Sequence, residues 1–114
     1  MKGTPPVMSR YVLALTTCNA SESETIARTL VERRVCACVN IVPSVTSIYR
    51  WKGEIAHDSE HLLLIKTEKR LVDDLKRILP EAHSYEVPEL IVIDITDGSS
   101  DYLSWVTGCV TPDE

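Results

Sequence analysis

Two long β-prone runs, residues 38–51 and 54–67, dominate the hydrophobic pattern of the chain. Both are rich in Val, Ile, Leu, Thr and Tyr, and Gly53 between them can supply the positive φ of a bulged hairpin turn. The pattern predicts one long β-hairpin with its turn at residues 51–54. Each arm would extend about 45 Å, whereas a compact chain of this length is only about 35 Å across. The hairpin must therefore bend or overhang, and Pro43, which cannot donate to the ladder, is a suitable place for a bend.

Before the hairpin, the pattern predicts a strand and then a helix. Residues 11–17 form a β-prone run with apolar side chains on both faces, as in a central strand. Ser21 and Glu24 have the spacing of a capping box, and apolar residues then follow at helical spacing: Ile26, Ala27, Leu30 and Val31. Residues 1–9 contain a glycine and two prolines and show no periodicity, so we expect a flexible leader before a single domain at residues 10–114.

After the hairpin, the pattern predicts a helix, a strand and a last helix. Thr67 can cap the first of these helices and Pro80 can close it; its buried stripe would consist of Leu71, Val72, Leu75, Ile78 and Leu79. Residues 86–95 predict the fourth strand. Ser99 or Ser100 can cap a C-terminal helix with an apolar face made by Tyr102, Trp105, Val106 and Cys109.

This order of elements, β-α-β-β-α-β, is the split βαβ arrangement and places the chain in the α+β class. We expect a four-stranded antiparallel sheet with the two main helices on one face. Its other face would be bare and aliphatic, and the overhanging hairpin carries Tyr49 and Trp51. Such surfaces need covering, so we expect a homo-oligomer with Tyr49 and Trp51 of the hairpin, and Trp105 of the last helix, at its interface.

Composition and charge narrow the function classes. The chain has 114 residues, 44% of them hydrophobic and 25% charged, which is ordinary for one globular domain. Apolar runs fall short of a membrane span, and the first residues lack the apolar core of a secretory signal. We expect a cytoplasmic protein, with processing from an organellar precursor left open. A net charge of −5 without a basic cluster argues against nucleic acid and leaves cationic ligands open.

The four cysteines show no disulfide or zinc spacing, so we interpret them as thiols. Cys36 and Cys38 are two apart and would point to one side of a strand, as small core residues or as metal ligands. The sequence contains no visible catalytic triad, glycine-rich phosphate loop or closed zinc spacing, which argues against an enzyme.

Five blocks of the sequence resemble the signature blocks of the CutA divalent-cation-tolerance family, in the same order and over about residues 11–110: residues 36–43, 47–53, 64–67, 83–89 and 102–105. The resemblance implies a ferredoxin-like subunit in a tight homotrimer, similar in architecture to the PII signalling proteins. It also implies a part in divalent metal ion tolerance and response, with copper binding as the recurrent activity and a link to acetylcholinesterase anchoring in eukaryotic relatives.

The resemblance implies candidate metal ligands as well. In bacterial relatives the copper site consists of a cysteine and a His-His pair. These positions align with Thr16, Ala82 and His83, so His83 is the only one of the three that is still a metal-binding residue. A further departure is Ser84, where the family usually has proline. The first hypothesis is therefore a trimer that binds copper or zinc through His83, with Cys18 or Cys38 as further ligands.

The rival hypothesis is a PII-like trimeric sensor that holds a small anionic ligand in a cleft between subunits. Lys66 would supply the positive charge, and the other cleft residues would be Tyr49, Trp51, Tyr85, Glu86 and Glu89. A third reading, an acylphosphatase-like enzyme on the same fold, would need an arginine-bearing loop after the first strand. Residues 18–22 offer an acidic loop instead.

Overall fold

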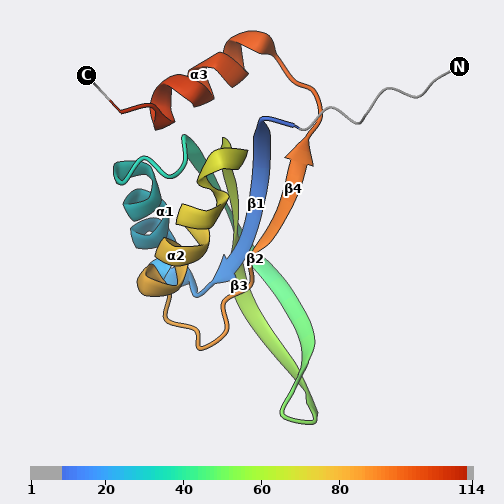
Figure 1. Ribbon diagram of the computed structural model, residues 1–114. Helices are drawn as coiled ribbons and strands as arrows, with labels where there is room; N and C mark the ends of the chain where they lie inside the picture. Colours follow the sequence, from blue (N-terminus) through green and yellow to red (C-terminus); the bar gives the residue numbers. More distant parts are fainter. Residues whose placement is uncertain (1–8, 113–114) are drawn as a thin grey trace, which may run out of the picture.

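A computed structural model describes residues 9–112 of the chain. The predicted leader, residues 1–9, lies outside this range except for Ser9, whose hydroxyl donates a hydrogen bond to the carbonyl of Ile95. Single 3₁₀ turns, Ala20–Glu22 and Lys69–Leu71, precede the first two helices. The main elements, shown in Figure 1, are β1 (Tyr11–Cys18), α1 (Ser23–Glu32), β2 (Cys38–Trp51), β3 (Glu54–Glu68), α2 (Val72–Ala82), β4 (Ile91–Ile95) and α3 (Ser100–Val110).

The strands form one antiparallel sheet in the order β2-β3-β1-β4, and α1 and α2 cover one of its faces (Figure 1). This confirms the predicted ferredoxin-like α+β fold. Alternate residues of β1, from Val12 to Cys18, are buried, because successive side chains of a strand point to opposite faces. Of these, Ala14 and Cys18 pack in a core whose largest side chains are Ile26 and Leu30 of α1, Leu63 and Ile65 of β3, and Leu75 and Leu79 of α2.

The hairpin of β2 and β3 extends beyond the body of the domain (Figure 1). Its turn is Lys52-Gly53, as predicted, and Gly53 has a φ of +83°, which a residue without a Cβ adopts at little cost. The predicted bend is also confirmed. The register between the strands shifts from Val42 to Val45, and Ser44 has a φ of +60° in this bulge directly after Pro43.

The C-terminal helix α3 lies across one end of the sheet (Figure 1) and packs Val106 and Val110 against Ala37 and Leu71. Ser99 caps it by accepting a hydrogen bond from the amide of Tyr102, as one of the two predicted caps. The apolar face is narrower than predicted, since Tyr102 and Trp105 are about half exposed.

A buried carboxylate fastens α3 to the sheet. Glu68 at the end of β3 is 1% exposed, yet it accepts hydrogen bonds from Arg10, from Arg70 (2.7 Å each) and from Thr107 of α3 (2.9 Å). The Tyr11 hydroxyl lies 2.7 Å from the hydroxyl of the same Thr107. Burial opposes ionisation, but the three donors outweigh it and lower the pKa of Glu68.

Three predicted element boundaries are wrong, since each of the residues concerned lies inside an element or turn rather than at the predicted end. Thr67 does not cap a helix: β3 continues through it, and its hydroxyl donates to the carbonyl of Val35. Ser21 does not cap α1 either, since it lies within the 3₁₀ turn that precedes the helix. Pro80 lies inside α2, which continues to Ala82, because helical φ suits proline and only one hydrogen bond is lost near the helix end.

The fourth strand is also shorter than predicted, since β4 begins at Ile91 rather than Glu86. Residues 83–90 form a loop instead of a strand, and this loop bears on the candidate site described below. Within residues 9–112, every helix is too short or too polar to cross a membrane.

Candidate ligand-binding site

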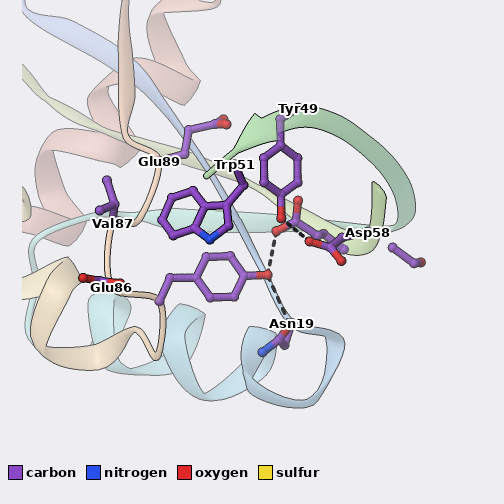
Figure 2. A pocket seen from close by; sticks show the side chains of 10 residues that line it. Asn19, Tyr49, Trp51, Asp58, Glu86, Val87 and Glu89 are labelled. Carbon is purple, nitrogen blue, oxygen red and sulfur yellow. Dashed lines mark hydrogen bonds between the residues drawn. The ribbon is translucent and has the colours of Figure 1, made fainter. Parts of the chain in front are cut away.

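A cavity of about 480 Å³ lies between the hairpin and the loop of residues 83–90 (Figure 2). It brings together five of the six residues predicted for a ligand cleft: Tyr49, Trp51, Tyr85, Glu86 and Glu89. The other five lining residues were not predicted: Asn19, Asp58, Ser59, Glu60 and Val87. All ten lining residues belong to one chain, and a cleft between subunits stays a prediction.

Strand pairing explains why the hairpin residues meet. Trp51 pairs with Glu54 across the turn. Moving away from the turn by two residues at a time, Tyr49 pairs with Ala56, Ser47 with Asp58 and Val45 with Glu60. Residues two apart share a face of a strand, so Tyr49, Trp51, Asp58 and Glu60 all project from one face of the hairpin. The predicted turn already implied this register, and counting pairs back from it would have found Asp58 and Glu60.

The phenols of the cavity are hydrogen-bonded to its carboxylates. Tyr85 donates to Glu60 over 2.6 Å and lies 3.1 Å from the side-chain oxygen of Asn19. Tyr49 donates to Asp58 (Figure 2). The pKa of Tyr85 is raised well above its usual range by burial and by the bond to Glu60, and the bond to Asp58 raises the pKa of Tyr49. Both rings therefore keep their protons at neutral pH and serve as donors.

The charge of the cavity differs from the prediction. Its ionisable carboxyl groups are Asp58, Glu60, Glu86 and Glu89, and none of the ten lining residues is a Lys, Arg or His. Lys66, the predicted anion contact, is not among them. Its ammonium donates to the side chain of Asn40 and lies 3.7 Å from the sulfur of Cys38, on β2. The arrangement suits a positively charged ligand and repels an anion.

His83, the main candidate metal ligand, has both ring nitrogens occupied. It is 7% exposed; Nε2 donates to the carbonyl of Thr17 over 2.7 Å, and Nδ1 accepts from the amide of Tyr85 over 3.1 Å. Strand β4 pairs with β1 only from Tyr11 to Leu15, so the imidazole supplies the donor that β4 does not offer to Thr17. In this arrangement His83 connects the loop to the sheet.

Ser84 has a role that a proline at this position could not have. Its amide donates to Glu22 over 3.1 Å and its hydroxyl donates over 2.6 Å. Burial opposes ionisation of Glu22, but these bonds, together with the nearby His83, lower its pKa. A proline has neither donor, so this chain holds the loop against the start of α1 through Ser84.

The two candidate cysteines do not join His83 in a metal site. Cys18 is fully buried, and burial together with Glu22 and Glu60 raises its pKa to about 11, which disfavours the thiolate that binds metals. Cys18 pairs with His61 of β3 and Cys38 with Lys66, five residues along, so the two thiols lie on opposite faces of the sheet. Between Ser9 and Pro112, no three His, Cys, Asp or Glu side chains are grouped to hold a metal ion. These residues do not fit a metal in this conformation.

The geometry defines a ferredoxin-like α+β domain with a projecting hairpin and an acidic, aromatic cavity beside it. A family model, CutA1 divalent ion tolerance protein, matches residues 11–109, and the chain belongs to this family. It is 45% identical over 95 residues to the divalent-cation tolerance protein CutA of Thermus thermophilus, covering 83% of this chain and 92% of that protein.

Two further relatives add detail. The chain is 47% identical over 94 residues to mouse protein CutA, covering 82% of this chain but 53% of that protein, so it spans about half the length of this mammalian relative. The PII-like protein CutA from Nostoc, in apo form, has a TM-score of 0.82 and 38% identity, covering 88% of this chain and 97% of that one.

Proposed function

We propose that the chain assembles as a homotrimer that takes part in the cellular response to divalent cations, in the cytoplasm, by binding rather than by catalysis. Membership of the CutA1 family supports the link to divalent ions, and the likeness to a PII-like relative supports an oligomer. The observation that carries the assembly is the amount of apolar surface left uncovered on a single subunit. Four isoleucines are about half exposed or more: Ile48, Ile55, Ile91 and Ile93.

These side chains occupy places where another subunit could cover them. Ile48 and Ile55 project from the face of the hairpin that is opposite to the cavity, since Ile48 pairs with His57 and Ile55 with Arg50. Ile91 and Ile93 belong to β4, which pairs with β1 along one side only and forms an edge of the sheet. An exposed apolar edge strand is a template for association. Of the predicted interface rings, Trp105 is half exposed on α3, whereas Tyr49 and Trp51 line the cavity.

Light scattering of the purified protein tests the assembly. We expect a mass three times that of the 12.8 kDa chain at micromolar concentration. The double variant Ile48→Glu/Ile55→Glu should dissociate, because it places charges where apolar contacts would form. Arg28→Glu, an exposed α1 residue, changes the net charge by the same amount and should leave the trimer intact. A monomeric parent would refute the assembly.

Direct metal contact through His83 stays a prediction, and its ring must first give up its bond to Thr17 or to Tyr85. Calorimetric titration with Cu(II) and Zn(II), on the parent and on His83→Ala, tests it. Loss of a one-per-subunit site in the variant would support ligation. Identical isotherms would leave His83 with the structural role described above.

A second candidate function is that of a PII-like sensor of a small molecule, and the cavity favours it. At about 480 Å³ it has the size of a small-molecule site, and it combines apolar rings with a few polar groups. Saturable binding of any small molecule there, detected through Trp51, would support the sensor function.

A further inference from the structure

The cavity contains a buried carboxylate without a counter-ion. Glu60 is 6% exposed and accepts a hydrogen bond from the Tyr85 hydroxyl, but no Lys, Arg or His of residues 9–112 forms an ion pair with it. Buried charges are normally paired, because desolvation of a lone carboxylate is costly. A neutral phenol compensates for only part of that cost. A cation in the cavity would complete the environment of Glu60.

The surroundings of Glu60 add to the preference of the cavity for a cation. Asp58 projects from the same face of the hairpin, and Glu86 and Glu89 contribute two further carboxylates from the loop (Figure 2). The lining includes no basic residue, so the four charges reinforce one another. Because Glu86 and Glu89 are exposed, they are placed to attract a cation from solvent, whereas Glu60 lies deeper.

The aromatic walls distinguish an organic cation from a metal ion. Divalent ions need several oxygen, nitrogen or sulfur ligands at about 2.0–2.6 Å, and within residues 9–112 no three His, Cys, Asp or Glu side chains are grouped to hold one. Ammonium groups instead bind to the faces of aromatic rings, tryptophan most strongly. The Trp51 ring already attracts one, since the Lys52 ammonium lies 5.9 Å from its centroid. Tyr49 and Tyr85 add two further rings.

We propose that the cavity binds a small organic cation, an amine or a quaternary ammonium compound, with its charge between the Trp51 ring and the Glu60 carboxylate. This rests on the proposed sensor function, whose ligand class it specifies. The assignment reverses the anionic ligand expected from Lys66, which bonds to Asn40 outside the lining.

The test uses Trp51 as the reporter. The chain has two tryptophans, so the Trp105→Phe variant leaves Trp51 as the single fluorophore of its kind. This variant is titrated with tetramethylammonium chloride and with 1,4-diaminobutane, at an ionic strength kept constant with sodium chloride. We expect a saturable fluorescence change with at least one of the two cations. Sodium phosphate and magnesium chloride, titrated in the same way, should give none.

Substitutions then locate the charge. Glu60→Gln keeps the shape and the acceptor for Tyr85 but removes the charge, so the affinity should fall about tenfold or more. Glu89→Gln, at an exposed position that cannot disturb the core, should also weaken binding. Glu32→Gln is the control: Glu32 lies on α1 outside the cavity, so the same change of charge there should leave the affinity unchanged. Equal affinities in all three variants would overturn the proposal.

The other outcomes separate the inference from the function on which it rests. Saturable binding of phosphate alone would keep the sensor function and overturn the cationic ligand. Saturable binding of magnesium alone would show that the carboxylates serve a metal ion, which also overturns it. No response to any probe would count against both. Light scattering on the parent protein, which keeps Trp105, reports the trimer independently of ligand binding in the cavity.

Discussion

Strand β3 carries two buried glutamates, eight residues apart on the same face, and their surroundings are opposite in character. Glu68, 1% exposed, has ion pairs with Arg10 and Arg70 and a hydrogen bond from α3. Glu60, 6% exposed, accepts one hydrogen bond, from the phenol of Tyr85, and lines the cavity. The chain thus neutralises one carboxylate itself and leaves the other for a ligand to neutralise. The difference separates the structural end of the sheet from its binding end.

This difference predicts the largest effect on stability for Glu68→Gln. The substitution removes the charge from two ion pairs and weakens the attachment of α3, so the free energy of unfolding should fall by about 2–3 kcal/mol. Urea denaturation at fixed protein concentration measures it. Glu60→Gln is the matched control, and an equal loss in that variant would contradict the contrast between the two residues.

The same contrast should appear in the pH dependence. The pKa of Glu68 is lowered on folding, so its ionised form stabilises the native state at pH values above the pKa of the unfolded chain, near the ordinary glutamate value of 4.5. That contribution is lost as the pH falls below 4.5 and through the lowered native pKa. Thermal melts from pH 6 to pH 3 should therefore show the parent converging toward Glu68→Gln at the acid end. A constant gap across that range would rule out this linkage.

A smaller effect is expected for Thr107→Val, which keeps the shape but removes the hydroxyl between Glu68 and Tyr11. The loss should be about 1 kcal/mol by urea denaturation. Thr29→Val is the control and should change stability less, because the Thr29 hydroxyl donates to the carbonyl of Thr25 in the same helix, at an exposed position. The opposite ranking would mean that α3 is not fastened through this cluster.

The smallest effect on stability is expected for Glu60→Gln. The amide oxygen can still accept from Tyr85, and the cost of an unpaired buried charge disappears, so the free energy of unfolding should stay within about 1 kcal/mol of the parent or rise. Thermal denaturation without added amine measures this. A fall comparable to that of Glu68→Gln would indicate that Glu60 is structural.

Local sequence signals predicted the hairpin and the fold well. Gly53 marked the turn and Pro43 the bulge because both act on the backbone where they stand, and periodic apolar residues marked the helices. Five residues that line the cavity, Tyr49, Trp51, Tyr85, Glu86 and Glu89, were expected to lie around one cleft. Asp58 and Glu60 were missed, although the register from the turn would have placed them beside Tyr49.

The predictions that failed for residues 86–90 and for Lys66 depend on contacts between distant segments. Residues 86–90 have strand-like composition, yet they form a loop because His83 bonds to Thr17 and Ser84 to Glu22. Lys66 looked like an anion contact at a strand end, but Asn40 on the neighbouring strand accepts its hydrogen bond. Such partners are set by tertiary packing and leave no periodic trace in the sequence.

The most direct test of the contrast between Glu60 and Glu68 is the melting temperature of the parent and of Glu60→Gln in rising tetramethylammonium chloride, with ionic strength held by sodium chloride. A ligand that binds only the native state stabilises it by about 2.7 kcal/mol at about 100 times its Kd. We expect the parent to melt at progressively higher temperature and the variant to change much less. Equal shifts in both proteins, or none in the parent, would contradict the assignment of Glu60 to a cationic ligand.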